Sequence, residues 1–352
     1  MLSSYKKIDT LKTAYGDFHI ILPTVPKVPS AIVVPQTPQT PLLPSIPSVT
    51  EVPQAIHLAG SDMNINRHIK FSKRIPPNYI PHSFDKELKR RRNKNTRIGE
   101  ITKDYLSAYL RGKLLSLKEV KEKLTKAGFT IIASVPLDKK STLISVVFTD
   151  NSLLKLSSKE NRGFASTLRV LIDTKEKSIS ITNPLYVTKG FLQNDYNEKI
   201  ASNLLTKILT QFSGLKNSKD ALRAKLLAGF HFMKGMPYYK EMLEVASGDD
   251  LEKRIKNNKK VVFSHKLQNG STIVGVTLGR RTQKFYKKIG RNNIGMLPYP
   301  VLIENGKAKI LDPKYYIAYM YPLLTMSKFM IIATIPDAIF RDVERIFRKK
   351  RR

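Results

Sequence analysis

Cysteine is absent from this chain of 352 residues. The chain can therefore form no disulfide framework, no thiolate nucleophile and no cysteine-based metal site. No two of its histidines have the spacing of metal ligands on one helix. The histidines are His19, His57, His68, His82, His231 and His265. We predict that the protein holds no metal and no cofactor.

Sequence motifs of the common enzyme classes are missing as well. The chain contains no GxGxxG, GxxxxGK[ST], GxSxG or HExxH, which mark dinucleotide, nucleoside triphosphate, hydrolase and zinc protease sites. The adjacent acids Asp249 and Asp250 suit a helix cap better than acid–base catalysis on one substrate. We therefore predict a non-enzymatic protein without catalytic residues.

Long apolar runs are also missing. Asp17 and His19 interrupt the N-terminal segment where a secretory signal would need an apolar region. The most apolar segment, residues 315–336, contains Pro322 and Lys328, so it does not read as a membrane span. We expect no secretory signal, no transmembrane helix and a bacterial cytoplasmic location.

Acidic residues are few: 28 Asp+Glu stand against 62 Lys+Arg, a formal net charge of +34. Such a surplus raises the affinity for any polyanion, whether nucleic acid or anionic lipid. A generally basic proteome would give the same balance, so the position of the charges has to decide between the two explanations. The hydrophobic content of 41% is enough for a packed core.

Proline recurs every third residue between residues 23 and 53. Polyproline II has three residues per turn and rises about 3.1 Å per residue, so this arm would span on the order of 95 Å. Most residues between the prolines are apolar or carry a hydroxyl, which favours a strap lying along another surface. A plain rigid spacer is the alternative. The prolines in this register are Pro23, Pro26, Pro29, Pro35, Pro38, Pro41, Pro44, Pro47 and Pro53.

A basic stretch follows the arm, at residues 54–97. Its cations are interleaved with Phe71, Tyr79 and Phe84, a composition that suits phosphate contact together with base stacking. A solvated linker is the alternative. The predicted anion contacts in this stretch are Arg67, Lys70, Lys73, Arg74, Lys89, Arg90, Arg91, Arg92, Lys94 and Arg97.

Two further groups of cations extend the predicted polyanion surface. One follows Gly279 and could equally be a solvated helix face; the other is the C-terminal tail. The predicted contacts are Arg280, Arg281, Lys284, Lys287 and Lys288 in the first group, and Arg348, Lys349, Lys350, Arg351 and Arg352 in the second.

The rest of the chain repeats itself at an offset of about 130 residues. An ordered series of matches indicates an internal repeat, and each copy mixes helix and strand patterns. We predict an α+β fold of two tandem related modules with antiparallel sheets and packing helices. The matches are STLI at 141–144 with STIV at 271–274, VLID at 170–173 with VLIE at 301–304, and ISITNPLYV at 179–187 with AKILDPKYY at 308–316.

Cap and turn signals outline each module. SLKE at 116–119 is a capping box, and Ser247 and Asp250 are the predicted caps of a helix around Leu251 and Ile255. Asn-Gly at 269–270 and at 305–306 predicts two hairpins. We expect a long helix to close each module, capped in the first by Asn194 or Asp195 and starting near Pro336 in the second.

These signals divide the chain into six parts. The predicted bounds are 1–22 for an N-terminal segment, 23–53 for the arm, 54–97 for the basic stretch, 98–245 and 246–347 for the two modules, and 348–352 for the basic tail.

The stretch LPYPVLIENGKAKILDPKYYIAY resembles a known family. Its Leu297-Pro298 step, hydrophobic strand, Gly-containing turn and Asp312-Pro313 step are similar to the domain-of-unknown-function 302 family of bacterial proteins. Residues 115–347 are similar to twin-module hypothetical proteins of the Campylobacterota. The first copy keeps Asn183-Pro184 and lacks the Leu-Pro step. The resemblance implies a small α+β fold that is often dimeric, and it implies no catalytic residue.

Three functions remain open from the sequence. The first is a structural component that seats itself on RNA or DNA in a nucleoprotein assembly, with RNA favoured and neighbouring proteins under the arm. The second is a module that binds or converts a small molecule between its copies, in a cleft near His231, Tyr186 and Tyr315 and lined also by Tyr238, Tyr239 and Tyr316. The third is a peripheral protein on an anionic membrane.

Overall fold

The computed structural model describes residues 10–13, 16–19, 97–102 and 104–348. The chain divides into two compact units, Met1–His68 and Ile69–Arg352. In the first unit, the described residues form an antiparallel hairpin of β1 (Thr10–Thr13) and β2 (Gly16–His19). The predicted arm, the basic stretch up to residue 96 and the tail residues 349–352 lie outside the described residues.

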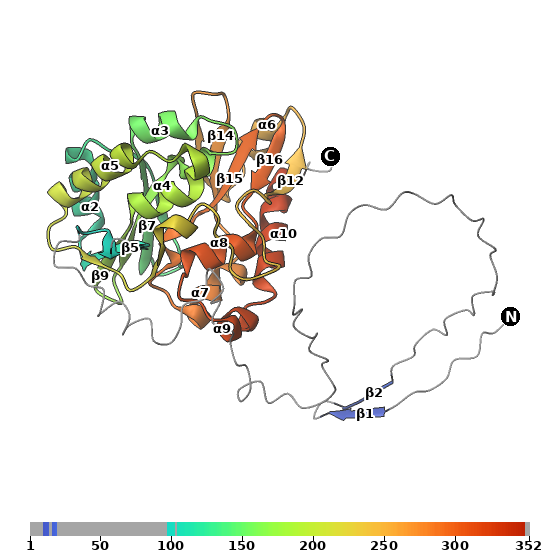
Figure 1. Cartoon of the computed structure of the whole chain (residues 1–352). Helices are drawn as coiled ribbons and strands as arrows, with labels where there is room; N and C mark the ends of the chain where they lie inside the picture. The colour runs from blue at the N-terminus through green and yellow to red at the C-terminus, as the bar shows by residue number, and fades with distance from the viewer. Residues whose placement is uncertain (1–9, 14–15, 20–96, 103, 349–352) are drawn as a thin grey trace, which may run out of the picture. The chain divides into compact units, whose positions relative to one another are not determined.

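Two antiparallel sheets form the centre of the second unit (Figure 1). Their strand orders are β10-β5-β9-β8-β7-β6 and β12-β16-β15-β14-β13. Helices pack on both, which confirms the predicted α+β class with antiparallel sheets. The first sheet contains β5 (Tyr109–Lys113), β6 (Thr130–Pro136), β7 (Leu143–Thr149), β8 (Leu168–Asp173), β9 (Ser178–Thr182) and β10 (Lys216–Asn217). The second contains β12 (Leu243–Ser247), β13 (Val261–Lys266), β14 (Thr272–Val276), β15 (Tyr299–Glu304) and β16 (Lys307–Ile310).

The strands β5 to β9 and β12 to β16 follow the same order in the two sheets. The hairpins β6–β7 and β13–β14 also share an irregularity in register. It lies between Ile131 and Ala133 in the first hairpin, and between Val261 and Phe263 in the second. The two modules therefore share a strand topology. A third, small sheet in the order β11-β4-β3 joins β3 (Glu100–Thr102), β4 (Tyr105–Ser107) and β11 (Ala221–Arg223).

Helices lie beside both sheets. In the first module α2 packs on β6 and on α5, and in the second α10 packs on β12, α6 and α8 (Figure 1). The first module contains α2 (Leu117–Lys126), α3 (Asn151–Ser157), α4 (Pro184–Leu192), α5 (Glu198–Gln211) and the 3-10 helices η1 (Gly163–Ser166) and η2 (Gln193–Asp195); η3 (Ala224–Leu226) follows. The second contains α6 (Leu251–Ile255), η4 (Thr282–Phe285), α7 (Tyr286–Ile289), η5 (Ile294–Met296), α8 (Pro313–Met320), α9 (Met326–Ile331) and α10 (Ile335–Phe347).

Most of the predicted helix starts are present. The capping box forms at Ser116 and Glu119, whose side chains each accept a hydrogen bond from the other's backbone N–H. The helix around Leu251 starts after Asp250, although the Asp250 side chain makes no capping hydrogen bond. The predicted cap of α5 at Asn194 or Asp195 is wrong. Those residues form η2, and the side chain of Asn197 caps α5 by accepting a hydrogen bond from the N–H of Ile200 (3.1 Å).

Both predicted Asn-Gly hairpins form. In the turn between β13 and β14, the N–H of Leu267 donates to the carbonyl of Ser271 (2.7 Å). In the turn between β15 and β16, Asn305 and Gly306 have φ of 50° and 69°. Two central residues with positive φ are what a type I′ turn requires, and its twist matches that of the flanking strands.

The repeated Asn-Pro and Asp-Pro steps mark helix starts that were not predicted. Asn183 caps α4 and Asp312 caps α8, each through a hydrogen bond from the N–H two residues later. Proline suits the first helical position because it has no N–H to leave unpaired there. The steps therefore end β9 and β16 and turn the chain into α4 and α8, placing Tyr186 and Tyr315 on buried helices.

The two modules pack through reciprocal contacts. In the first module η1 lies on β14 and β15, and in the second η5 lies on β8 and β9. A Cβ on Gly163 would overlap the side chain of Leu302, and a Cβ on Gly295 would lie 3.1 Å from the Cβ of Leu171. Leu171 and Leu302 hold the same place in VLID and VLIE. Each glycine thus allows close approach to the equivalent strand of the other module.

Among the helices in the part of the chain that the structure describes, none has the length and the apolar character that crossing a bilayer requires.

Candidate anion-binding site

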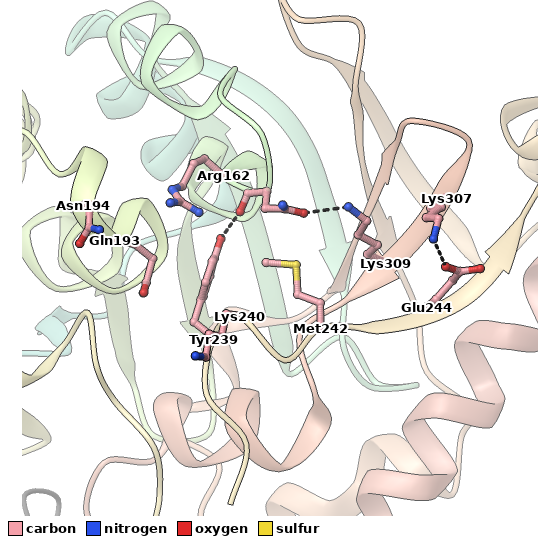
Figure 2. Close-up of a pocket in the computed structure, with 10 residues that line it drawn as sticks. Arg162, Gln193, Asn194, Tyr239, Lys240, Met242, Glu244, Lys307 and Lys309 are labelled. Carbon is pink, nitrogen blue, oxygen red and sulfur yellow. Dashed lines mark hydrogen bonds and ion pairs between the residues drawn. The ribbon is translucent and has the colours of Figure 1, made fainter.

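A pocket of about 430 Å³ lies between the two modules (Figure 2). The first module contributes the turn before η1 and the segment η2 at the end of α4. The second contributes β12, the residues just before it, and β16; β12 starts at Leu243 and belongs to the second sheet, so this module begins before the predicted boundary at residue 246. The lining residues are Asn161, Arg162, Gln193, Asn194, Tyr239, Lys240, Met242, Glu244, Lys307 and Lys309. Pockets of this volume accommodate small molecules or one unit of a polymer.

Four cations and one carboxylate line this pocket, and two further carboxylates, Glu304 and Asp195, pair with its cations from behind. Four positive charges therefore stand against three negative ones. Lys307 lies 3.0 Å from a carboxylate oxygen of Glu244. Lys309 donates to the side-chain oxygen of Asn161 (2.8 Å) and lies 3.6 Å from Glu304. Lys240 is exposed and makes no ion pair with any described residue. Lys240 is therefore the cation most open to a ligand.

Arg162 is held at the pocket by an acid of η2. Its Nε donates to Asp195 (2.8 Å), which also accepts from the Nζ of Lys159 (2.6 Å). The hydrogen bond from Lys159, followed by that from Arg162, lowers the pKa of the Asp195 carboxyl despite its partial burial. Asp195 is thus charged at neutral pH and neutralises part of the positive charge of Lys159 and Arg162. Arg162 keeps further N–H groups that can bind a ligand.

Asn161 and Tyr239 fix the floor of the pocket. Asn161 has a φ of 57°, which a short polar side chain tolerates, and its N–H donates to Glu304 (3.0 Å). The hydroxyl of Tyr239 donates to the Asn161 carbonyl (2.6 Å). Burial raises the pKa of Tyr239, so this hydroxyl stays neutral and remains a donor. Hydrogen bonds therefore hold both residues of the floor in place, and the Tyr239 hydroxyl adds no negative charge to it.

The reciprocal packing creates a second, equivalent position, which differs from the pocket. Asn161-Arg162 directly precedes η1, and Asn292-Asn293 directly precedes η5. At the second position the hollow is about 210 Å³ and is lined by one aspartate and one lysine, Asp220 and Lys328. Only the first position combines the larger volume with several cations.

Arg111 binds three residues that line the second hollow. Its guanidinium donates to the Asn292 carbonyl (3.0 Å) and to the side-chain oxygen of Asn293 (2.6 Å), and it pairs with Asp220 (3.1 Å). Arg111 therefore donates a hydrogen bond to the Asn292 carbonyl, as Tyr239 does to the Asn161 carbonyl. Arg111 is thus bound on several sides within the protein, whereas Lys240 of the first position makes no ion pair with a described residue and lines the pocket.

The acids of VLID and VLIE tie the modules together beside these two positions. Asp173 accepts two hydrogen bonds from Arg291 of the second module, both 2.7 Å. Glu304 accepts from the N–H of Asn161 of the first module. Each acid ends the fourth of the five equivalent strands of its own module, β8 or β15, and binds the segment before the other module's short 3-10 helix. The pocket is therefore built on a rigid inter-module contact.

The predicted cleft residues lie away from this pocket, with one exception. Tyr186 and Tyr315 are each 1% exposed in the aromatic core between α4 and α8, so neither offers a surface to a ligand. His231 lies against Tyr238, with ring centroids 4.4 Å apart. Tyr239, which the sequence placed in the same cleft, does line the pocket.

The predicted anion contacts that lie within the described residues fall into two kinds. Arg280, Arg281, Lys284, Lys287 and Lys288 are all exposed, on or next to η4 and α7. Arg97 and Arg348 are engaged with carboxylates: Arg97 with Glu100 and Glu198, and Arg348 with Glu344. The other predicted contacts and the stacking residues Phe71, Tyr79 and Phe84 lie outside the described residues.

The cations of the pocket were not predicted. Lys307 and Lys309 follow the second Asn-Gly turn, and their alternation along β16 puts both on one face of the strand. Arg162 and Lys240 are far from them in sequence. One signal in the sequence could have located the pocket: Asn161-Arg162 aligns with Asn292-Asn293 in the repeat. Each of these steps precedes the short helix that packs on the other module.

The pocket presents lysine, arginine and amide side chains, which suit the binding of an anion. No group of three or more His, Cys, Asp and Glu residues that could hold a metal occurs within the described ranges. No family model, curated protein or solved structure matches the chain. The resemblance of residues 115–347 to the domain-of-unknown-function 302 family therefore stays a prediction.

Proposed function

We propose that the protein is a non-enzymatic binding component that holds a phosphate-bearing polyanion, with RNA favoured. We propose further that the polyanion binds at the pocket between the two modules. The observation that supports this is the convergence of Arg162, Lys240, Lys307 and Lys309 on a pocket with one carboxylate, Glu244. Lysine and arginine are the residues that contact phosphate.

Two further features favour RNA over an isolated anion. Asn161, Gln193 and Asn194 add amide groups to the pocket, and such groups can hydrogen-bond to base edges and to the 2′-hydroxyl. Residues 97–348 also contain 44 Lys and Arg against 22 Asp and Glu, so a polymer leaving the pocket would meet further positive charge. The predicted basic stretch at 54–97 and the tail would extend this contact.

The volume of the pocket supports a second candidate, a free phosphate ester. About 430 Å³ lies within the range of small-molecule sites, and the same cations would bind the phosphate group. The two candidates share their chemistry and differ in whether affinity grows with the length of the ligand.

Fluorescence anisotropy of the full chain with a labelled single-stranded RNA of about 16 nucleotides tests the proposal. If three to four phosphates are contacted, the slope of log K against log[KCl] should be about −2 to −3. Affinity should then fall about 20- to 50-fold between about 50 and 200 mM KCl. The basic stretch and tail would make the slope steeper.

Adenosine 5′-monophosphate as competitor separates the two sources. The proposal expects it to displace RNA only at concentrations far above that of the oligonucleotide, because one phosphate releases few counterions. Displacement at comparable concentrations would contradict the RNA assignment and support a small phosphate ester. No detectable binding of either probe at low salt would contradict the proposed function altogether.

A further inference from the structure

The short helix α9 turns apolar side chains into solvent. Met326, Met330 and Ile331 are 39%, 59% and 55% exposed, whereas Phe329 and Ile332 anchor the helix in the core. Phe329 packs on Phe232, with ring centroids 5.3 Å apart. Single exposed apolar residues are ordinary, but three large ones on a helix of six residues form a patch.

Lysines surround this apolar patch. Lys328 lies on α9 itself, and α7, which packs beside α9, carries Lys287 and Lys288 (Figure 1). The Nζ of Lys288 lies 3.5 Å from the carbonyl of Ile331, the end of α9. Lys284 on η4 precedes α7, and all four lysines are exposed.

Acidic residues are missing from the segments that form this surface. Residues 253–303 and 313–336, which include α7 and α9, contain no Asp or Glu. The lysines of the patch therefore have no carboxylate neighbours in their own segments, unlike Lys307 in the pocket, which pairs with Glu244. None of these four lysines makes an ion pair with a described residue, although Asp220 lines the same hollow as Lys328, so most of this positive charge is open to a partner.

We propose that the corner formed by α9 and α7 docks on an anionic lipid surface, with Met326, Met330 and Ile331 entering the acyl–headgroup boundary and the lysines contacting headgroup phosphates. Proteins that lie at membrane interfaces combine apolar side chains with flanking Lys and Arg in this way. RNA would match the lysines and leave the apolar side chains in water, so lipid fits the whole surface better.

The absence of tryptophan from the chain provides a direct probe. In the full-length Ile331→Trp variant, tryptophan emission should shift to shorter wavelength on vesicles of phosphatidylglycerol and phosphatidylcholine, and brominated acyl chains should quench it. Vesicles of phosphatidylcholine alone should produce neither change. The matched control is Leu114→Trp, at a position that is 38% exposed between β5 and α2 of the first module; its emission should not respond.

Binding measurements complete the test. Met330→Asp/Ile331→Asp should weaken sedimentation with the anionic vesicles about tenfold or more, because both side chains lose apolar contact. Its melting temperature should be unchanged, since both residues are exposed. Vesicle binding without a tryptophan shift, or without loss in this variant, would show attraction by charge alone and overturn the proposal. The same shift with RNA and no vesicles, or no vesicle binding, would also overturn it.

Discussion

Replacing Gly190 with alanine should lower the free energy of unfolding by about 3 kcal/mol. Gly190 lies on α4 against α8, and an added Cβ would overlap the hydroxyl of Tyr319 and lie 2.7 Å from its Cε2. Tyr319 cannot move away easily, because its hydroxyl donates to the Tyr186 carbonyl (2.6 Å) and the Tyr186 hydroxyl donates to the Tyr319 carbonyl (3.0 Å). The expected measurement is a lower urea midpoint with an unchanged m-value.

Gly229→Ala is the matched control, since a Cβ there would meet no atom within 4 Å. This change should leave stability unchanged or raise it slightly, through the lower entropy of the unfolded chain. Combining Gly190→Ala with Tyr319→Ala should cost less than the sum of the two single changes, because the overlap disappears. Equal stability of Gly190→Ala and the natural chain would contradict the close packing of α4 on α8.

The second large effect is expected at the inter-module ion pair. Arg291→Ala should destabilise the protein by about 3 kcal/mol, because it leaves the buried carboxylate of Asp173 without its partner. Asp173 has a side-chain exposure of 3% and accepts both hydrogen bonds of the pair. The hydrogen bonds with Asp173 raise the pKa of Arg291, so the guanidinium stays charged over the pH range in which unfolding is measured.

Lys159→Ala removes an ion pair of ordinary surface type and serves as control. Lys159 is 58% exposed and its partner Asp195 keeps Arg162, so the loss should be below about 1 kcal/mol. A similar small loss for Arg291→Ala would mean that the contact between VLID and the second module contributes little. The modules would then have to be held together mainly by the glycine and tyrosine contacts.

Local patterns predicted much of the fold because their causes are local. The capping box at Ser116 and the Asn-Gly turns need only neighbouring residues to form. The starts of α4 and α8 were missed although proline after Asn or Asp is itself a helix signal. The apolar residues after each proline have no helical stripe, since both helices are buried almost all round.

The pocket could not be predicted from local patterns. Its four cations come from segments up to about 150 residues apart, and reciprocal packing of the modules brings them together. The anion contacts were predicted from dense runs of Lys and Arg, such as residues 89–94. Single cations such as Lys240 and Arg162 lie in no such run and were not predicted. Tyr186 and Tyr315 matched each other in the repeat for a structural reason, because both build the core between α4 and α8.

The most direct test of the account is RNA binding by Lys240→Glu/Lys307→Glu beside Lys118→Glu/Lys126→Glu. All four lysines are exposed, both variants change the net charge equally, and the second pair lies on α2 outside the pocket. We expect the pocket variant to lose affinity about tenfold or more and to flatten the salt slope by about 1 to 2, since each lost phosphate contact removes about 0.7 from it. The α2 variant should keep the natural slope. Equal losses of RNA affinity in both variants would show that binding depends on net charge alone. That result would contradict binding of the polyanion at the pocket.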